Sequence, residues 1–213
     1  MAFSHFTRGV LRITLATGLC AGATAAGIAQ QAGVAPLALD SARVSIAGTS
    51  NIHEYTASTT SVRITRVHLA AAGVPGSDLW TQILTPGALD AFEVAIPAAT
   101  LASPKEGIDK NMRKALKVQE HPDITFRLTR LEARAGTAGA LRGVGLLRIA
   151  GVEREVALDI TTARNGSTLS VRGAVQLLMT DFGVTPPTAM LGMLKTDPKV
   201  TVTFETVLAI PRT

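Results

Sequence analysis

Strict alternation of apolar and polar residues constrains this 213-residue chain more than any other feature. It is clearest in residues 124–131, where Ile124, Phe126 and Leu128 alternate with polar residues. Alternation with a period of two gives a strand one buried and one solvated face, which is typical of antiparallel sheets. The pattern recurs in residues 43–47, 61–69, 92–96, 144–149, 154–160, 170–178 and 200–210.

The alternating segments predict an all-β fold of about eight or nine antiparallel strands, as a closed barrel or a sandwich. Asn165 and Gly166 form the strongest hairpin signal, because both residues tolerate positive φ. Residues 105–117 predict one main helix, since Ile108, Met112 and Leu116 recur every four residues on one face. Residues 187–194 predict a short second helix that begins at prolines.

The N-terminus has the order of regions of an export signal. Arg8 and Arg12 precede an apolar, small-residue stretch over residues 13–26, and small residues follow at the expected cleavage site. We therefore expect a signal peptide over 1–29, cut near residues 25–29, a linker over 30–38, a single domain over 39–213 and a periplasmic location. Cys20, the single cysteine, would be discarded with the signal.

Charge and motifs give few signs of chemistry. The net charge is +5, and basic residues are scattered among acids without a stripe that alternates with aromatics. Nucleic acid is therefore not an expected partner. The sequence contains no phosphate loop, metal-spaced Cys/His cluster or nucleophile elbow. We expect a protein that is not an enzyme and that needs no cofactor or metal.

Two polar residues remain candidates for a site. His53 ends a polar stretch and would either orient a ligand head group or act as an acid/base; the simpler interpretation is a hydrogen-bonded histidine at a strand end. Asp181 follows residues 179–180 and would be a site carboxylate if buried. The simpler interpretation is an aspartate that bonds the backbone of its own turn.

Five stretches in a fixed order carry a resemblance to a known family. They are IDKNMRKAL at 108–116, HPDITF at 121–126, LLRIAGV at 146–152, MTDFGV at 179–184 and VTVTF at 200–204. With these stretches the chain resembles the YceI-like family of polyisoprenoid-binding periplasmic proteins, and the resemblance covers roughly residues 39–210. The resemblance implies an antiparallel lipocalin-like β-barrel that holds a long isoprenoid or fatty chain, with residues 109–116 and 179–187 bordering the cavity.

These observations predict a carrier that holds an apolar ligand of isoprenoid, quinone or fatty-acyl type inside a β-barrel. The partner is then a long-chain small molecule, without stable membrane insertion, and a homodimer stays open. Two alternatives also stay open: an enzyme acting on a lipid-like substrate, or a ligand-free stress-response or redox accessory protein. The expected ligand-binding residues are Val44, Ile46, His53, Met112, Leu116, Phe126, Leu128, Asp181, Phe182, Met190, Leu194 and Phe204.

Overall fold

The computed structural model describes residues 37–70, 78–134, 139–189 and 193–210. The expected signal peptide and most of the linker lie outside these residues. The strands are β1 Ala38–Ser50, β2 Glu54–Thr59, β3 Arg63–Leu69, β4 Leu89–Pro97, β5 Asp123–Ala133, β6 Ala140–Ile149, β7 Val152–Asn165, β8 Thr168–Leu178, β9 Thr188–Ala189 and β10 Leu194–Ala209. The helices are α1 Leu79–Leu84 and α2 Glu106–Ala115, with 3-10 turns η1 Ala98–Thr100 and η2 Met179–Phe182.

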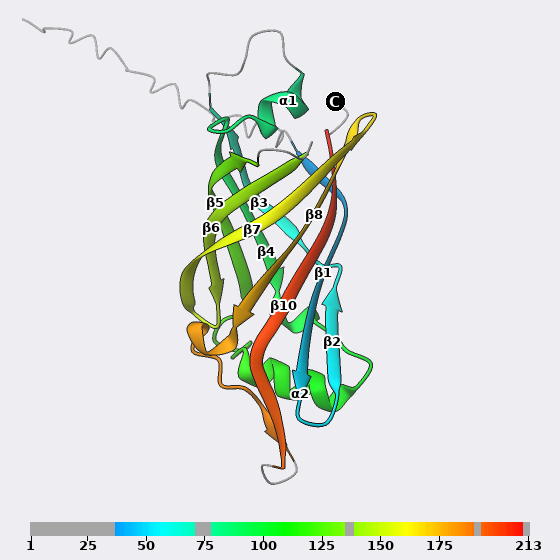
Figure 1. Cartoon of the computed structure of the whole chain (residues 1–213), viewed down its shortest axis with the longest axis vertical. Helices are drawn as coiled ribbons and strands as arrows, with labels where there is room; N and C mark the ends of the chain where they lie inside the picture. The colour runs from blue at the N-terminus through cyan, green and yellow to red at the C-terminus, as the bar shows by residue number, and fades with distance from the viewer. Residues whose placement is uncertain (1–36, 71–77, 135–138, 190–192, 211–213) are drawn as a thin grey trace, which may run out of the picture. The chain divides into compact units, whose positions relative to one another are not determined.

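Nine strands form one antiparallel sheet in the order β2-β1-β10-β8-β7-β6-β5-β4-β3, and β9 pairs with the start of β10. The sheet curls round, because β2 and β3 stand at opposite ends of the order but follow each other in the chain (Figure 1). A bridge between Ser58 and Ala102 and a 2.7 Å hydrogen bond between Thr59 and Thr100 hold the β2 edge. The predicted antiparallel, lipocalin-like barrel is confirmed.

The alternating segments identified in the sequence all fall on strands of this sheet. In β7 the half-buried Val156, Leu158 and Ile160 alternate with the exposed Glu155 and Asp159. Alternation thus places the apolar residues inside the barrel and the charges outside. Strand β2 was not predicted, because its sequence EYTAST offers small and polar residues in place of large apolar ones.

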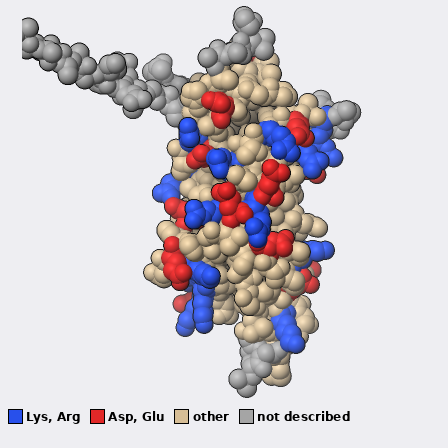
Figure 2. Space-filling model, turned by 90° about the vertical axis from the view of Figure 1, so that its left-hand side faces the viewer, with Lys and Arg blue, Asp and Glu red and all other residues tan. Residues whose placement is uncertain are grey.

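Charges cover the outer face of the sheet in mixed order. Figure 2 shows acidic and basic side chains interleaved over one side of the barrel. Arg134 and Asp159 are 2.8 Å apart, and Arg130 lies 3.8 Å from Glu155, so these pairs link β5 or its end to β7. All four side chains are about half exposed or more, so each pair adds little stability and mainly keeps this face wet.

The predicted hairpin at Asn165 is confirmed, with the turn placed one residue later than expected. Asn165 pairs with Thr168, so Gly166 and Ser167 form the two-residue loop. Gly166 has a φ of 57°, a backbone conformation that glycine adopts without steric cost.

Helix α2 confirms the predicted main helix, but the predicted helix over 187–194 is wrong. Thr188 and Ala189 instead pair as β9 with Lys195 and Leu194 of β10. Pairing with β10 gives the backbone groups of β9 hydrogen-bond partners in a neighbouring strand. A short helix would leave the backbone groups at its two ends without partners inside the helix.

The second helix is α1, which sequence reasoning missed because six residues are too few to show a helical period. The sequence feature that could have indicated α1 is its N-cap residue, Asp78. In the structure Asp78 Oδ1 accepts hydrogen bonds from Trp80 N at 3.0 Å and Thr81 N at 3.3 Å. The cap fixes α1 so that Trp80 and Ile83 are buried at the end of the barrel.

Loss of this cap should destabilise the α1 end of the barrel. We expect Asp78→Ala to lower the urea midpoint, read by the emission of Trp80, which is the single tryptophan and is 2% exposed. Asp78→Asn should have a smaller effect, since asparagine also caps helices but loses the 3.0 Å ion pair with Arg164. An Asp78→Ala midpoint equal to that of the unmodified protein would contradict this role.

The cap should also respond to acid. Desolvation raises the pKa of Asp78, but hydrogen bonds from Thr81 and Arg164 outweigh it and hold this pKa below its ordinary value. A lowered folded-state pKa means that the carboxylate stabilises the fold above about pH 4, and that this contribution is lost as the pH falls through the lowered pKa. The free energy of unfolding of Asp78→Asn should therefore lack the part of the acid-induced decrease that comes from protonation of this carboxylate.

Candidate functional site

The lower chamber is an apolar cavity of about 370 Å³ at the α2 end of the barrel. Its walls come from β1, β2, α2, the start of β5, the end of β6, the end of β8 with η2, and the first half of β10. The apolar lining residues are Ile46, Ile108, Met112, Ala115, Leu116, Ile124, Ile149, Leu177, Leu178, Met179, Phe182, Val184, Pro187, Leu194, Val200 and Val202.

Helix α2 supplies one wall of the lower chamber. Ile108, Met112 and Leu116 project from a single face because they are spaced by four residues. The helix is held by Asp109, a buried residue whose Oδ1 accepts a hydrogen bond from Ser103 N at 2.8 Å. Acidic residues in its first turn and basic residues in its last turn also favour the helix dipole.

Polar residues gather at the solvent-facing rim of the lower chamber. His53, Lys105 and Asn111 are exposed there. His53 Nδ1 lies 3.0 Å from Ser50 Oγ, which also accepts from His53 N at 3.1 Å, so the histidine is tied into its own turn. Burial, followed by the nearby charge of Asp197, raises the pKa of Tyr55, which therefore stays a neutral phenol near pH 7. The rim offers hydrogen bonds at one end of an apolar space.

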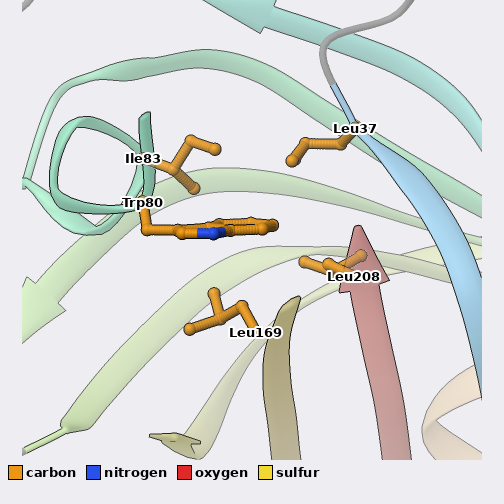
Figure 3. Close-up of a cluster of buried hydrophobic side chains, with 5 residues drawn as sticks. All are labelled: Leu37, Trp80, Ile83, Leu169 and Leu208. Atoms are coloured by element: carbon orange, nitrogen blue, oxygen red, sulfur yellow. The ribbon is translucent and has the colours of Figure 1, made fainter. Parts of the chain in front are cut away.

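The upper chamber is a second apolar cavity, of about 210 Å³, toward the α1 end. It is lined by large residues of seven strands, among them Phe92, Phe126, Leu128, Leu158, Ile160 and Phe204. A cluster of Leu37, Trp80, Ile83, Leu169 and Leu208 packs at this end (Figure 3). Four of its members also line the chamber, so the Trp80 cluster forms the closed end of the interior.

Glycines keep the upper chamber open. Gly173 faces Phe204 in the β8–β10 register, and a Cβ there would collide with the Phe204 ring. Gly145 on β6 leaves the same kind of room for the Phe126 ring of β5. The two rings therefore lie flat against the wall and do not fill the interior.

The two chambers meet at Val202, which lines both. Ile46 from the lower chamber and Leu147 from the upper chamber pack against the same two buried clusters. We call Ile46, Leu147 and Val202 the waist. A chain that occupied both chambers would pass this point.

The structure places ten of the expected ligand-binding residues along the linings of the two chambers. Four residues line the upper chamber and six the lower one, and the two sets are Val44, Phe126, Leu128 and Phe204, then Ile46, His53, Met112, Leu116, Phe182 and Leu194. Asp181 is exposed on the outer side and lines an external opening beside β7 and β8. Met190 lies outside the described residues.

Sequence reasoning missed several lining residues. Tyr55 was missed with β2, and Asn111 sits between apolar positions of α2. Ile108 and Val202 were detectable, because each continues an apolar period that was already recognised.

The expected acid/base candidates do not form a pair. His53 is at the rim of the lower chamber, whereas Asp181 faces the outside. Within the described ranges, no group of three or more His, Cys, Asp or Glu residues is placed to hold a metal ion. No helix in the described part of the chain is long and apolar enough to cross a membrane.

The model of the YceI-like domain matches residues 39–208. The chain belongs to the YceI-like family. Solved structures superpose on it: BcnA of Burkholderia cenocepacia has a TM-score of 0.61 at 16% identity, over 78% of this chain and 95% of that one. A polyisoprenoid binding domain from Saccharophagus degradans has a TM-score of 0.58 at 13% identity, over 84% of this chain and 100% of its own. At these identities the likeness shows the fold. No curated protein matches the chain.

The glycine beneath Phe204 gives a direct test of how this YceI-like interior stays open. We expect Gly173→Ala to reduce the free energy of unfolding by about 1–3 kcal/mol, because the new methyl group forces the Phe204 ring into the chamber. Ala174→Val, at the adjacent exposed position, should change it by less than about 0.5 kcal/mol. Chemical denaturation measures both, and equal effects would mean that Gly173 is not needed to seat the ring.

Proposed function

We propose that this YceI-like protein is a carrier that holds one long apolar chain, of isoprenoid, quinone or fatty-acyl type, inside the barrel. The observation that carries the proposal is Val202, which borders both chambers, so that the two apolar spaces adjoin inside one barrel. In the proposal the bound chain extends through both, from the rim to the Trp80 cluster. The Saccharophagus degradans relative, described as a polyisoprenoid binding domain, supports the same ligand class.

The physical basis of affinity in this proposal is burial of methylene groups. Each buried CH₂ contributes about 0.8 kcal/mol, so Kd should fall roughly fourfold for each methylene that the path accommodates. The lining offers a bound ligand chain almost no polar partner. The protein would therefore distinguish ligands mainly by the length and shape of their apolar chains.

The rim supplies the orientation of the ligand. Tyr55, Lys105 and Asn111 offer a neutral phenol, an ammonium group and an amide at the solvent-facing end of the lower chamber. A ligand with one polar head and one apolar tail would place its head there and extend its tail toward the waist.

Export completes the proposal. The N-terminal 29 residues would direct the protein to the periplasm and be removed. An apolar chain has low solubility in the aqueous space there, and enclosure in the barrel would shield it from water.

Substitution at the waist tests the proposal. Val202→Phe should weaken the binding of chains that extend beyond the lower chamber by about tenfold more than the binding of chains short enough to fit within it, since the upper chamber becomes unreachable. Thr203→Phe is the matched control, because the next residue of β10 is exposed outside the barrel. Titration of saturated fatty acids of increasing length gives the measurement.

Two results would contradict the carrier. One is a Kd that does not depend on chain length in the unmodified protein. The other is an equal effect of Val202→Phe on short and long chains.

A further inference from the structure

Strands β7 and β8 separate within the wall of the barrel. Their ladder runs from Asn165–Thr168 to Asp159–Ala174 and ends there. Below that point β7 still pairs with β6 as far as Val152, and β8 still pairs with β10 as far as Leu178. Figure 1 shows the two strands meeting at their hairpin and diverging away from it. The sheet is therefore interrupted in its interior and not at an edge.

The space between the separated strands is an opening of about 650 Å³ on the outer surface. Exposed polar side chains surround it, including Arg154, Gln176 and Lys199. Its deeper residues are apolar, and Leu177 and Phe182 among them are buried. We call this opening the side gap.

The side gap lies directly against both chambers. Leu177, Leu178 and Phe182 line the gap and also the lower chamber. Val175 lines the gap and also the upper chamber. A single layer of side chains thus separates the outside from the interior, close to the junction of the two chambers.

The cover over the lower part of this layer is η2. It carries Phe182, which is 3% exposed, and it ends at Gly183, whose φ of 66° is left-handed. Arg154 of β7 reaches across and donates from Nε to the carbonyl of Asp181 at 3.0 Å. Leu178, at the end of β8, is 41% exposed beside this contact. One hydrogen bond from an exposed arginine therefore ties a short 3-10 turn to the far side of the gap.

We propose that the side gap is a lateral portal through which the apolar chain enters and leaves the barrel. In this proposal η2 covers the portal, and the hydrogen bond from Arg154 to the carbonyl of Asp181 holds η2 in place. The inference rests on the proposed function. A chain that enters here passes one layer of side chains to reach either chamber. A chain that enters at the rim reaches the upper chamber only past the waist.

A cross-link across the gap tests the portal. Ala157→Cys and Gln176→Cys place two exposed thiols opposite each other where the ladder would have continued. They are introduced into the full chain with Cys20→Ser and joined by a bis-maleimide. Energy transfer from Trp80 to a dansyl-labelled fatty acid in stopped flow then gives the association and dissociation rates.

A portal changes how fast the ligand enters and leaves the barrel, but it does not change the free energies of the free and bound states. The cross-link should slow association and dissociation together by about tenfold and leave Kd unchanged. The matched control is Thr161→Cys with Arg172→Cys, a pair in the closed part of the same ladder, and its cross-link should leave both rates unchanged.

A second variant acts in the opposite direction without a cross-link. Arg154→Gln removes the hydrogen bond to η2 and should accelerate both rates about threefold or more at constant Kd. Arg148→Gln, an exposed arginine of neighbouring β6, is the control.

Unchanged rates in both the cross-linked pair and Arg154→Gln would overturn the portal, and so would a Kd change without a change in the association rate. Failure of the proposed function has a different signature, since the unmodified protein itself would then not bind the labelled fatty acid.

Discussion

The structure depends on an apolar inner face that packs only against itself. A single curled sheet turns every second side chain inward, and the seating of Phe204 over Gly173 and of Phe126 over Gly145 keeps those side chains from meeting in the middle. Close packing is the ordinary state of a protein interior, so an enclosed apolar space that persists needs such a device. Helix α2 at one end and the Trp80 cluster at the other bound the space that results.

The proposed carrier function depends on the scarcity of polar groups in the interior as much as on its apolar lining. The described lining of both chambers is almost wholly aliphatic and aromatic, and the hydrogen-bonding groups gather at one rim. Such an interior provides free energy in proportion to the apolar surface that it covers. It would distinguish ligands by length and thickness, and it would leave recognition of the head group to a few exposed side chains.

The sequence predicted the strands, the main helix and most of the inward residues, because alternation and four-residue spacing are local signals of which side chain points where. It did not predict β2, whose inward positions are Tyr55, Ala57 and Thr59, or α1, which is shorter than two turns. The division of the interior at Val202 and the separation of β7 from β8 depend on which strands pair and how far, and a local pattern does not encode this. The outward direction of Asp181 is likewise not encoded by a local pattern, because it depends on the path of η2.

The most direct test of the central claim is a crystal structure of the protein purified from its own host with its ligand retained, together with mass spectrometry of the extracted lipid. We predict one stoichiometric apolar chain, with density that runs from the rim near Asn111 past Val202 to the Trp80 cluster. A barrel whose chambers are filled by its own side chains, with no stoichiometric lipid in the extract, would contradict it.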